Sequence, residues 1–90
     1  MVERLHGVIR GDVQGVGFRF FLIRRANALE LTGWVRNRDD GAVEFVAEGS
    51  RSGLEQLELA AREGPRMAHV TDIAVNWSNA TGGLDRFDIG

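Results

Sequence analysis

The chain is 90 residues long and 43% hydrophobic, which suits one small domain, residues 1–90, with a single core and no room to enclose a large cofactor. It contains no cysteine, which excludes disulfides, zinc–thiolate sites, iron–sulfur clusters and a cysteine nucleophile. The formal net charge is −2 and the eleven basic residues, all arginines, are dispersed. We therefore expect no nucleic-acid partner, because duplex nucleic acid favours a broad basic face.

The beginning of the chain, Met1 to His6, has no apolar run of the kind that a signal peptide needs. No other stretch approaches the length of a membrane span. We therefore expect a cytoplasmic protein with no membrane partner, and we expect it to be a monomer.

The first predicted elements are a strand and a helix. Residues 5–10 predict a short strand with Leu5 and Ile9 on one face. Residues 18–31 predict a helix, because apolar residues fall three or four positions apart and form one stripe, namely Phe18, Leu22, Ala26 and Leu29. That stripe is expected to face the core.

Two strands joined by a tight turn are expected next. Residues 34–38 and 43–48 are typical of strands, and Asp39-Asp40-Gly41 between them is a strong hairpin signal. In the second of these strands, alternation predicts one core face and one mostly solvent-exposed face. The core face would be Val43, Phe45 and Ala47, and the exposed face Glu44, Val46 and Glu48.

The rest of the chain predicts a second helix and one or two strands. Ser50 or Ser52 could cap a helix over residues 53–63, with Leu54, Leu57 and Ala61 buried, and Gly64-Pro65 would end it. A strand is expected over residues 70–77, with one face formed by Thr71, Ile73, Val75 and Trp77. Residues 84–89 could add a short fifth strand with Phe87 and Ile89 facing inward.

The order of these elements predicts an α+β fold of the ferredoxin-like βαββαβ type. In this sandwich two helices cover one face of a mainly antiparallel sheet. The fold hosts enzymes, RNA readers, metal carriers and regulatory domains, so function has to come from particular residues.

The most informative stretch is the loop from Gly11 to Arg19, which contains three glycines and leads into the first helix. Backbone N–H groups of such a loop can converge, and the helix N-terminus adds partial positive charge, so the stretch predicts a site for phosphate or another small anion. Arg19 would add a planar guanidinium that matches phosphate oxygens two at a time. The chain has no lysine, which excludes a Walker A loop. On this loop alone, the alternative is a tight strand-to-helix turn with a surface arginine.

Two longer motifs point to a family. The chain carries Gly11-x-Val13-Gln14-Gly15-Val16-Gly17-Phe18-Arg19-x-Phe21 and Gly33-Trp34-Val35-Arg36-Asn37-x-x-Asp40-Gly41-x-Val43-Glu44. With weaker agreement at Ala47-Glu48-Gly49 and Gly64-Pro65, it resembles the acylphosphatase family over nearly its whole length.

The resemblance implies a hydrolase that cleaves small acyl phosphates into a carboxylate and phosphate, without metal or cofactor, and binds inorganic phosphate as its product. It implies that Arg19 and the loop amides hold the phosphoryl group, and that Asn37 positions the attacking water. The residues whose backbone would take part are Gln14, Gly15, Val16, Gly17, Phe18 and Arg19.

The chemistry of the residues agrees with this interpretation. An acyl phosphate already has a carboxylate as its leaving group, so the reaction needs positioning and charge stabilisation more than a strong general acid. Asn37 offers an amide donor and a carbonyl acceptor, so it can orient water without acting as a base. From the family, we expect a phosphate oxygen of the substrate to take the proton.

Other interpretations stay open at this point. Asn37 lies near a hairpin and, taken alone, could be a turn residue. The chain could be a module that binds phosphate or carbamoyl phosphate with little catalytic activity of its own. It could also be an RNA reader, which would need exposed aromatic residues on the central strands, and residues 5–10 have none.

Three positions depart from the family pattern. Asp12 places a carboxylate beside the loop, where it would repel phosphate unless it points to solvent. Glu30 stands where the family often has the glycine that ends the first helix; it either costs about 1 kcal/mol in the left-handed conformation or avoids that conformation. Gly7 interrupts the first strand, where a branched side chain is commoner, and would weaken packing there.

Overall fold

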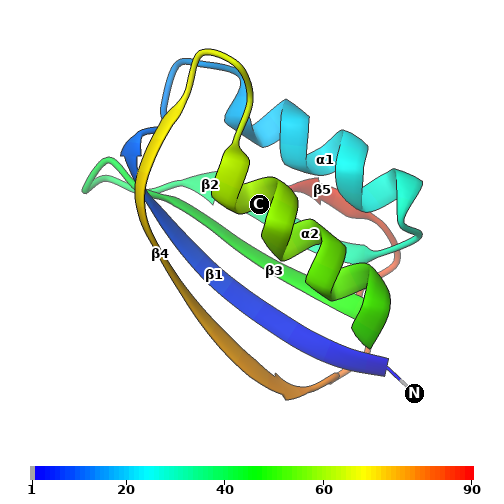
Figure 1. Ribbon diagram of the computed structural model, residues 1–90. Helices are drawn as coiled ribbons and strands as arrows, with labels where there is room; N and C mark the ends of the chain where they lie inside the picture. The colour runs from blue at the N-terminus through cyan, green and yellow to red at the C-terminus, as the bar shows by residue number, and fades with distance from the viewer. Residues whose placement is uncertain (1) are drawn as a thin grey trace.

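The computed structural model describes residues 2–90 as two helices packed on one face of a five-stranded sheet (Figure 1). The elements in chain order are β1 (Val2–Asp12), α1 (Phe18–Ala28), β2 (Thr32–Asn37), β3 (Val43–Ser50), α2 (Arg51–Glu63), β4 (His69–Asn79) and β5 (Phe87–Ile89). The strands lie in the order β4-β1-β3-β2-β5, and every neighbouring pair is antiparallel except β2 and β5. The predicted ferredoxin-like α+β sandwich is confirmed, including its fifth strand.

The core lies between the helices and the sheet. Its buried side chains come from both layers and from the segments that join them: Leu5, Ile9, Val13, Phe18, Leu22, Ala26, Leu31, Val35, Val43, Phe45, Ala47, Leu54, Leu57, Ala61 and Phe87. The predicted stripes of both helices therefore face inward, and Ser50 caps α2 by accepting a hydrogen bond from the backbone N–H of Gly53. Each large apolar side chain buried here stabilises the fold by about 1.5–3 kcal/mol relative to exposure.

Gly7 makes room for a core side chain. A Cβ placed on Gly7 would lie 2.3 Å from Cε1 of Phe45, whose ring is fully buried on the neighbouring strand. The expectation that Gly7 weakens packing is therefore wrong, because the absent side chain is what lets the Phe45 ring pack closely against β1.

The second face of β3 is not solvent-exposed, contrary to the prediction. Glu44, Val46 and Glu48 are each at least nine-tenths buried. β3 is the central strand, so side chains of β1 and β2 cover this face from both sides. His6 Nε2 lies 2.7 Å from one oxygen of Glu44, and Arg36 donates to the other. These partners, led by His6, hold the pKa of the Glu44 carboxyl below its usual value against the opposing effect of burial.

Glu48 is held in the same way by a different set of partners. Burial by itself would raise the pKa of the Glu48 carboxyl, but hydrogen bonds outweigh it and leave that pKa lowered. The donors are the backbone N–H groups of Thr81 and Gly82, at 2.8 and 3.2 Å, and the guanidinium of Arg4 at 2.9 Å. The buried carboxylate thus fixes the loop between β4 and β5 onto the sheet.

The predicted face of β4 is interrupted at Thr71, which is exposed. The register of β1 and β4 shifts at this point: Arg10 pairs with Asp72 but Gly11 pairs with Val70, so Thr71 is the extra residue of a bulge. Its hydroxyl donates to the carbonyl of Arg10 at 3.2 Å. The other predicted residues of that face are half-buried, namely Ile73, Val75 and Trp77.

Ile89 is also more exposed than predicted. Phe87 is 3% exposed, whereas Ile89, two residues later on β5, is 46% exposed. β5 is an edge strand that pairs only with β2 among residues 2–90, and Ile89 lies at its end, where fewer neighbours cover it.

α1 ends at Ala28, three residues earlier than predicted, in a turn built around Glu30. The N–H of Leu31 donates to the carbonyl of Ala26 and that of Glu30 to Asn27, and Glu30 has φ 58°. This pairing is a Schellman motif with a non-glycine residue in the left-handed position. Within residues 2–90, no helix is long and apolar enough to cross a membrane.

Replacement of Glu30 by glycine is expected to stabilise the fold. Glu30→Gly relieves the left-handed strain, so the free energy of unfolding should rise by about 1 kcal/mol in a urea titration. Ala28→Gly, two residues earlier at the last residue of α1, is the control and should lower it by about 1 kcal/mol. A destabilised Glu30→Gly protein would mean that other contacts of the glutamate outweigh the strain.

Candidate active site

The glycine loop is anchored at both ends by buried apolar side chains. Val13 follows β1 and is 1% exposed, and Phe18 begins α1 and is 2% exposed. The residues between them include Gln14, Gly15 and Gly17, which are exposed. The anchors therefore fix the loop while its backbone faces outward.

Gly15 and Gly17 are required by the backbone of the loop. Their φ angles are 74° and 80°, in the left-handed region that disfavours other residues. A Cβ on either residue would meet nothing within 4 Å, so the space in front of the loop is open. Gly17 is the N-cap of α1, where no side chain caps the helix and the first turn holds no acidic residue. The first N–H groups of α1 are thus free of side-chain acceptors and carry the positive end of the helix dipole.

Asn37 reaches the same end of the sheet as the loop. Both β1 and β2 pair antiparallel with β3, so β1 and β2 run in the same direction and end at the same edge. Asn37 is the last residue of β2, paired with Val43, and lies two positions after the buried Val35 on the face that carries the helices. It is therefore a strand residue and not part of the turn.

Arg19 and Asn37 line one small hollow of about 170 Å³. The structure thus brings together the two predicted catalytic residues and three of the predicted loop residues. The complete lining is Val13, Gly15, Gly17, Phe18, Arg19, Phe20 and Asn37. Arg19 is half-buried and forms no ion pair within residues 2–90, so its charge is available to an anion.

The side chain of Gln14 makes contacts that the sequence did not predict. Its side-chain Nε2 donates to the carbonyls of Arg38 and Ala42, at 2.8 and 3.0 Å. These two residues close the β2–β3 hairpin, where the N–H of Arg38 donates to Ala42 at 2.8 Å. Gln14 therefore ties the glycine loop to the hairpin that carries Asn37. The partners are far away in the sequence, so only the tertiary structure identifies them.

The hairpin itself is fixed by Asp40. Its carboxylate accepts a hydrogen bond from the N–H of Ala42 and forms ion pairs with Arg10 and Arg38, at 3.3 and 3.1 Å. The Ala42 hydrogen bond in particular lowers the pKa of Asp40. Asp40 is thus a turn residue, as predicted, and it fixes the hairpin that follows Asn37.

Asp12 is exposed and does not line the hollow. Trp34 contacts Arg36, whose guanidinium lies 5.0 Å from the ring centroid. Trp34 precedes the core residue Val35 on β2, so it lies on the face of the sheet opposite the helices. Among residues 2–90 no three His, Asp or Glu side chains gather as a possible metal site.

Comparison with known proteins places this geometry in a family context. Residues 5–89 match the family model described as Acylphosphatase. A curated protein named Acylphosphatase from Salinibacter ruber is 48% identical over 87 residues, which cover 97% of this chain and 92% of that protein. The crystal structure of acylphosphatase from Bacillus subtilis superimposes with a TM-score of 0.94 at 42% identity, covering 100% of this chain and 99% of that one.

A larger protein contains a similar fold. The crystal structure of full-length HypF in the phosphate- and nucleotide-bound form matches with a TM-score of 0.87 at 25% identity, and the match covers only 12% of that chain. The relatives that match over nearly their full length carry the enzyme's name, which favours a hydrolase over a binding module.

Proposed function

The chain belongs to the acylphosphatase family and is a hydrolase of acyl phosphates, and from this premise we propose how its residues perform the reaction. The phosphoryl group occupies the hollow between the glycine loop and the end of β2. Backbone N–H groups from Gln14 to Arg19 donate to its oxygens, and the Arg19 guanidinium supplies the formal positive charge. The open left-handed turns at Gly15 and Gly17 support this placement, since they leave the approach to the backbone clear.

Asn37 orients the attacking water. Its side-chain amide can accept a hydrogen bond from that water through the carbonyl and donate one through the nitrogen, so it fixes the direction of attack without removing the proton. The water oxygen forms a bond to phosphorus while the bond from phosphorus to the carboxyl oxygen breaks. The carboxylate leaves with the electron pair, and the water proton passes to a phosphate oxygen.

The remaining parts of the proposal follow from this chemistry and the family. A carboxylate leaves without protonation, so the residues of the hollow need to supply only position and charge. We propose that the enzyme works as a cytoplasmic monomer without metal or cofactor, and that inorganic phosphate, the product, binds in the same hollow.

The observation that carries the proposal is the convergence of Arg19 and Asn37 on one hollow. The first test is hydrolysis of acetyl and benzoyl phosphate in the presence of a metal chelator. We expect full activity with the chelator and little release of phosphate from ordinary monoesters, whose leaving groups need an acid. Loss of activity in chelator, or comparable cleavage of a monoester, would contradict the proposal.

A further inference from the structure

A larger groove opens directly beside the hollow. It has a volume of about 560 Å³ and is lined by Gly17, Phe20, Phe21, Arg24, Arg25, Ala28 and Pro65. Gly17 and Phe20 line the hollow as well, so the two spaces are continuous. We call this space the α1 groove.

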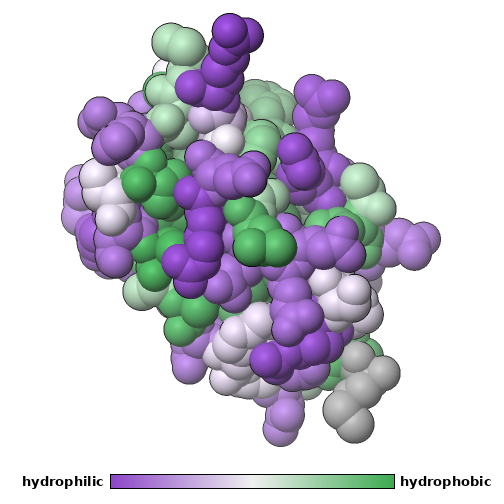
Figure 2. All heavy atoms as spheres, viewed as in Figure 1, coloured by the Kyte–Doolittle hydropathy of each residue, from purple (hydrophilic) through white to green (hydrophobic). Residues whose placement is uncertain are grey.

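The α1 groove is formed by one face of α1. Its helical residues recur at spacings that place them on adjacent turns of the same side, from Phe20 to Ala28. Phe20 is 68% exposed and lines the groove together with Phe21, so the groove offers two neighbouring aromatic rings to a bound group. Phe21 is better fixed, since its ring packs edge-on against Phe18 at 5.9 Å between centroids. Figure 2 shows hydrophobic side chains between hydrophilic ones on the face of the molecule that carries the helices.

Two arginines give the groove a positive charge at the end away from the hollow. Arg24 and Arg25 are exposed and form no ion pair within the described part of the chain. The Arg25 guanidinium lies 5.2 Å from the centroid of the Phe21 ring, and this cation–π contact holds the guanidinium above that ring. The step from Arg19 to Arg24 advances about 7.5 Å along the helix axis.

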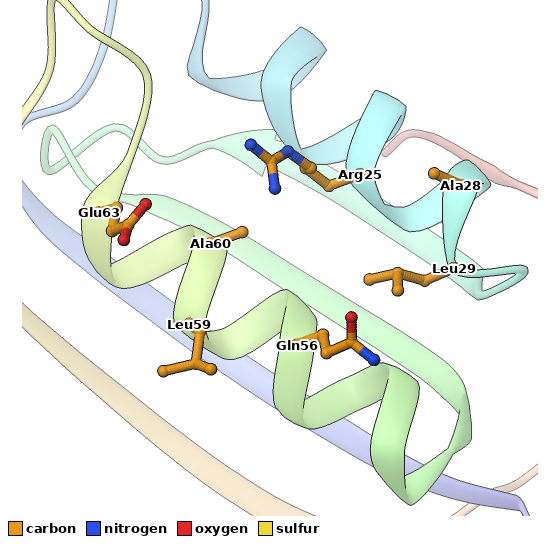
Figure 3. Close-up of a pocket in the computed structure, with 7 residues that line it drawn as sticks. All are labelled: Arg25, Ala28, Leu29, Gln56, Leu59, Ala60 and Glu63. Atoms are coloured by element: carbon orange, nitrogen blue, oxygen red, sulfur yellow. The ribbon is translucent and has the colours of Figure 1, made fainter.

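A second space adjoins the α1 groove at the end away from the hollow. It lies between α1 and α2, has a volume of about 320 Å³ and shares Arg25 and Ala28 with the α1 groove (Figure 3). Glu63 of α2 lines this second space, so an anionic group that passed beyond Arg25 would meet a carboxylate of the same charge.

We propose that the α1 groove binds the acyl part of the substrate and selects aromatic acyl phosphates that carry a second anionic group at the far end of the ring. This inference rests on the proposed placement of the phosphoryl group in the hollow. With the phosphorus there, an acyl group directed along α1 would lie over Phe20 and Phe21, and a para substituent would reach the guanidinium groups of Arg24 and Arg25. Phe20 then determines the preference for a ring, and the two arginines determine the preference for a negative end.

The test compares matched substrates by their kcat/KM values. Acetyl phosphate is the reference, because its acyl group is too short to enter the groove. Benzoyl phosphate measures the effect of an aromatic ring on kcat/KM. The comparison of 4-carboxybenzoyl phosphate with 4-carbamoylbenzoyl phosphate measures the effect of the negative charge, because the two substrates have nearly the same shape. Each ratio is compared between the parent and a variant, so that differences in intrinsic substrate reactivity cancel.

We expect Phe20→Ala to lower the ratio of benzoyl to acetyl phosphate by about fivefold, because one open aromatic contact is lost. The double variant Arg24→Gln, Arg25→Gln should lower the ratio of the carboxy to the carbamoyl substrate by about fivefold, and salt should erase that preference in the parent. Arg86→Gln is the matched control, since Arg86 is exposed, unpaired within residues 2–90 and outside the groove, and it should leave both ratios unchanged.

Several results would overturn the inference. Unchanged ratios in both groove variants, with acetyl phosphate still hydrolysed, would reject the groove and leave the proposed function intact. No turnover of acetyl phosphate by the parent would reject the proposed function itself. If Phe20→Ala instead abolished a concentration-dependent association in sedimentation while the ratios stayed constant, the groove would be a contact surface between copies of the chain.

Discussion

Arg19→Ala is expected to remove hydrolysis of acyl phosphates almost completely. Among residues 2–90, Arg19 is the one arginine that lines the hollow, so the variant loses the charge proposed to face the phosphoryl oxygens. Loss of one preorganised donor in such sites lowers kcat by roughly 10²–10³-fold, and the lost formal charge should place this variant at the upper end. The measurement is kcat/KM for acetyl phosphate, with Arg86→Ala as a control for a lost surface charge.

The lysine variant makes this prediction specific. Arg19→Lys keeps the charge, but an ammonium group cannot make the paired contacts of a planar guanidinium, so rescue should be poor. If Arg19→Lys had kinetics close to those of the parent, the Arg19 guanidinium would not bind the phosphate through two paired hydrogen bonds.

Asn37→Ala should have the second largest effect, and it should act on turnover alone. Its proposed partner is the attacking water, so kcat should fall by about 10²-fold or more while the dissociation constant of inorganic phosphate stays close to that of the parent. Steady-state kinetics and phosphate inhibition measure the two quantities on the same protein.

Asn76→Ala is a suitable control for this change, because Asn76 is an exposed asparagine on β4 that does not line the hollow. The proposed role of Asn37 would be wrong if Asn37→Ala lost phosphate binding but kept its turnover at saturating substrate.

Much of the site could be predicted because its parts are local in the sequence. The left-handed turns at Gly15 and Gly17 require glycine, and the hairpin at Asp40-Gly41 likewise requires glycine at a positive φ. The convergence of Arg19 with Asn37 depends on topology, but the order of strands and helices already implied that β1 and β2 run in the same direction.

The features that the sequence did not reveal depend on the order of strands in the sheet. An alternating strand with two glutamates is typical of a half-exposed strand, and only the central position of β3 explains why Glu44 and Glu48 are buried. The bulge at Thr71 shifts the alternation of β4, and the glycine that accommodates it, Gly11, lies on the partner strand β1, far away in the sequence. The side-chain bonds of Gln14 likewise join segments that have no relation in sequence.

The conformation of Glu30 is a different case. Its position at the end of the first helix indicated strain, and the sequence left two outcomes open. The φ of 58° shows which one the chain adopts, because the two hydrogen bonds of the helix end can form only around a left-handed residue.

The central claim is that phosphate binds at the glycine loop through Arg19, and thermal unfolding with inorganic phosphate at constant ionic strength tests it most directly. A ligand that binds only the folded state at a hundredfold excess over its Kd adds about 2.7 kcal/mol, which should raise the Tm of a domain of this size by several degrees. The account predicts this rise for the parent and for His69→Ala, an exposed change on β4 outside the hollow, and no rise for Arg19→Ala. If phosphate raised the Tm of Arg19→Ala as much as that of the parent, the anion would bind elsewhere and the account of the site would be contradicted.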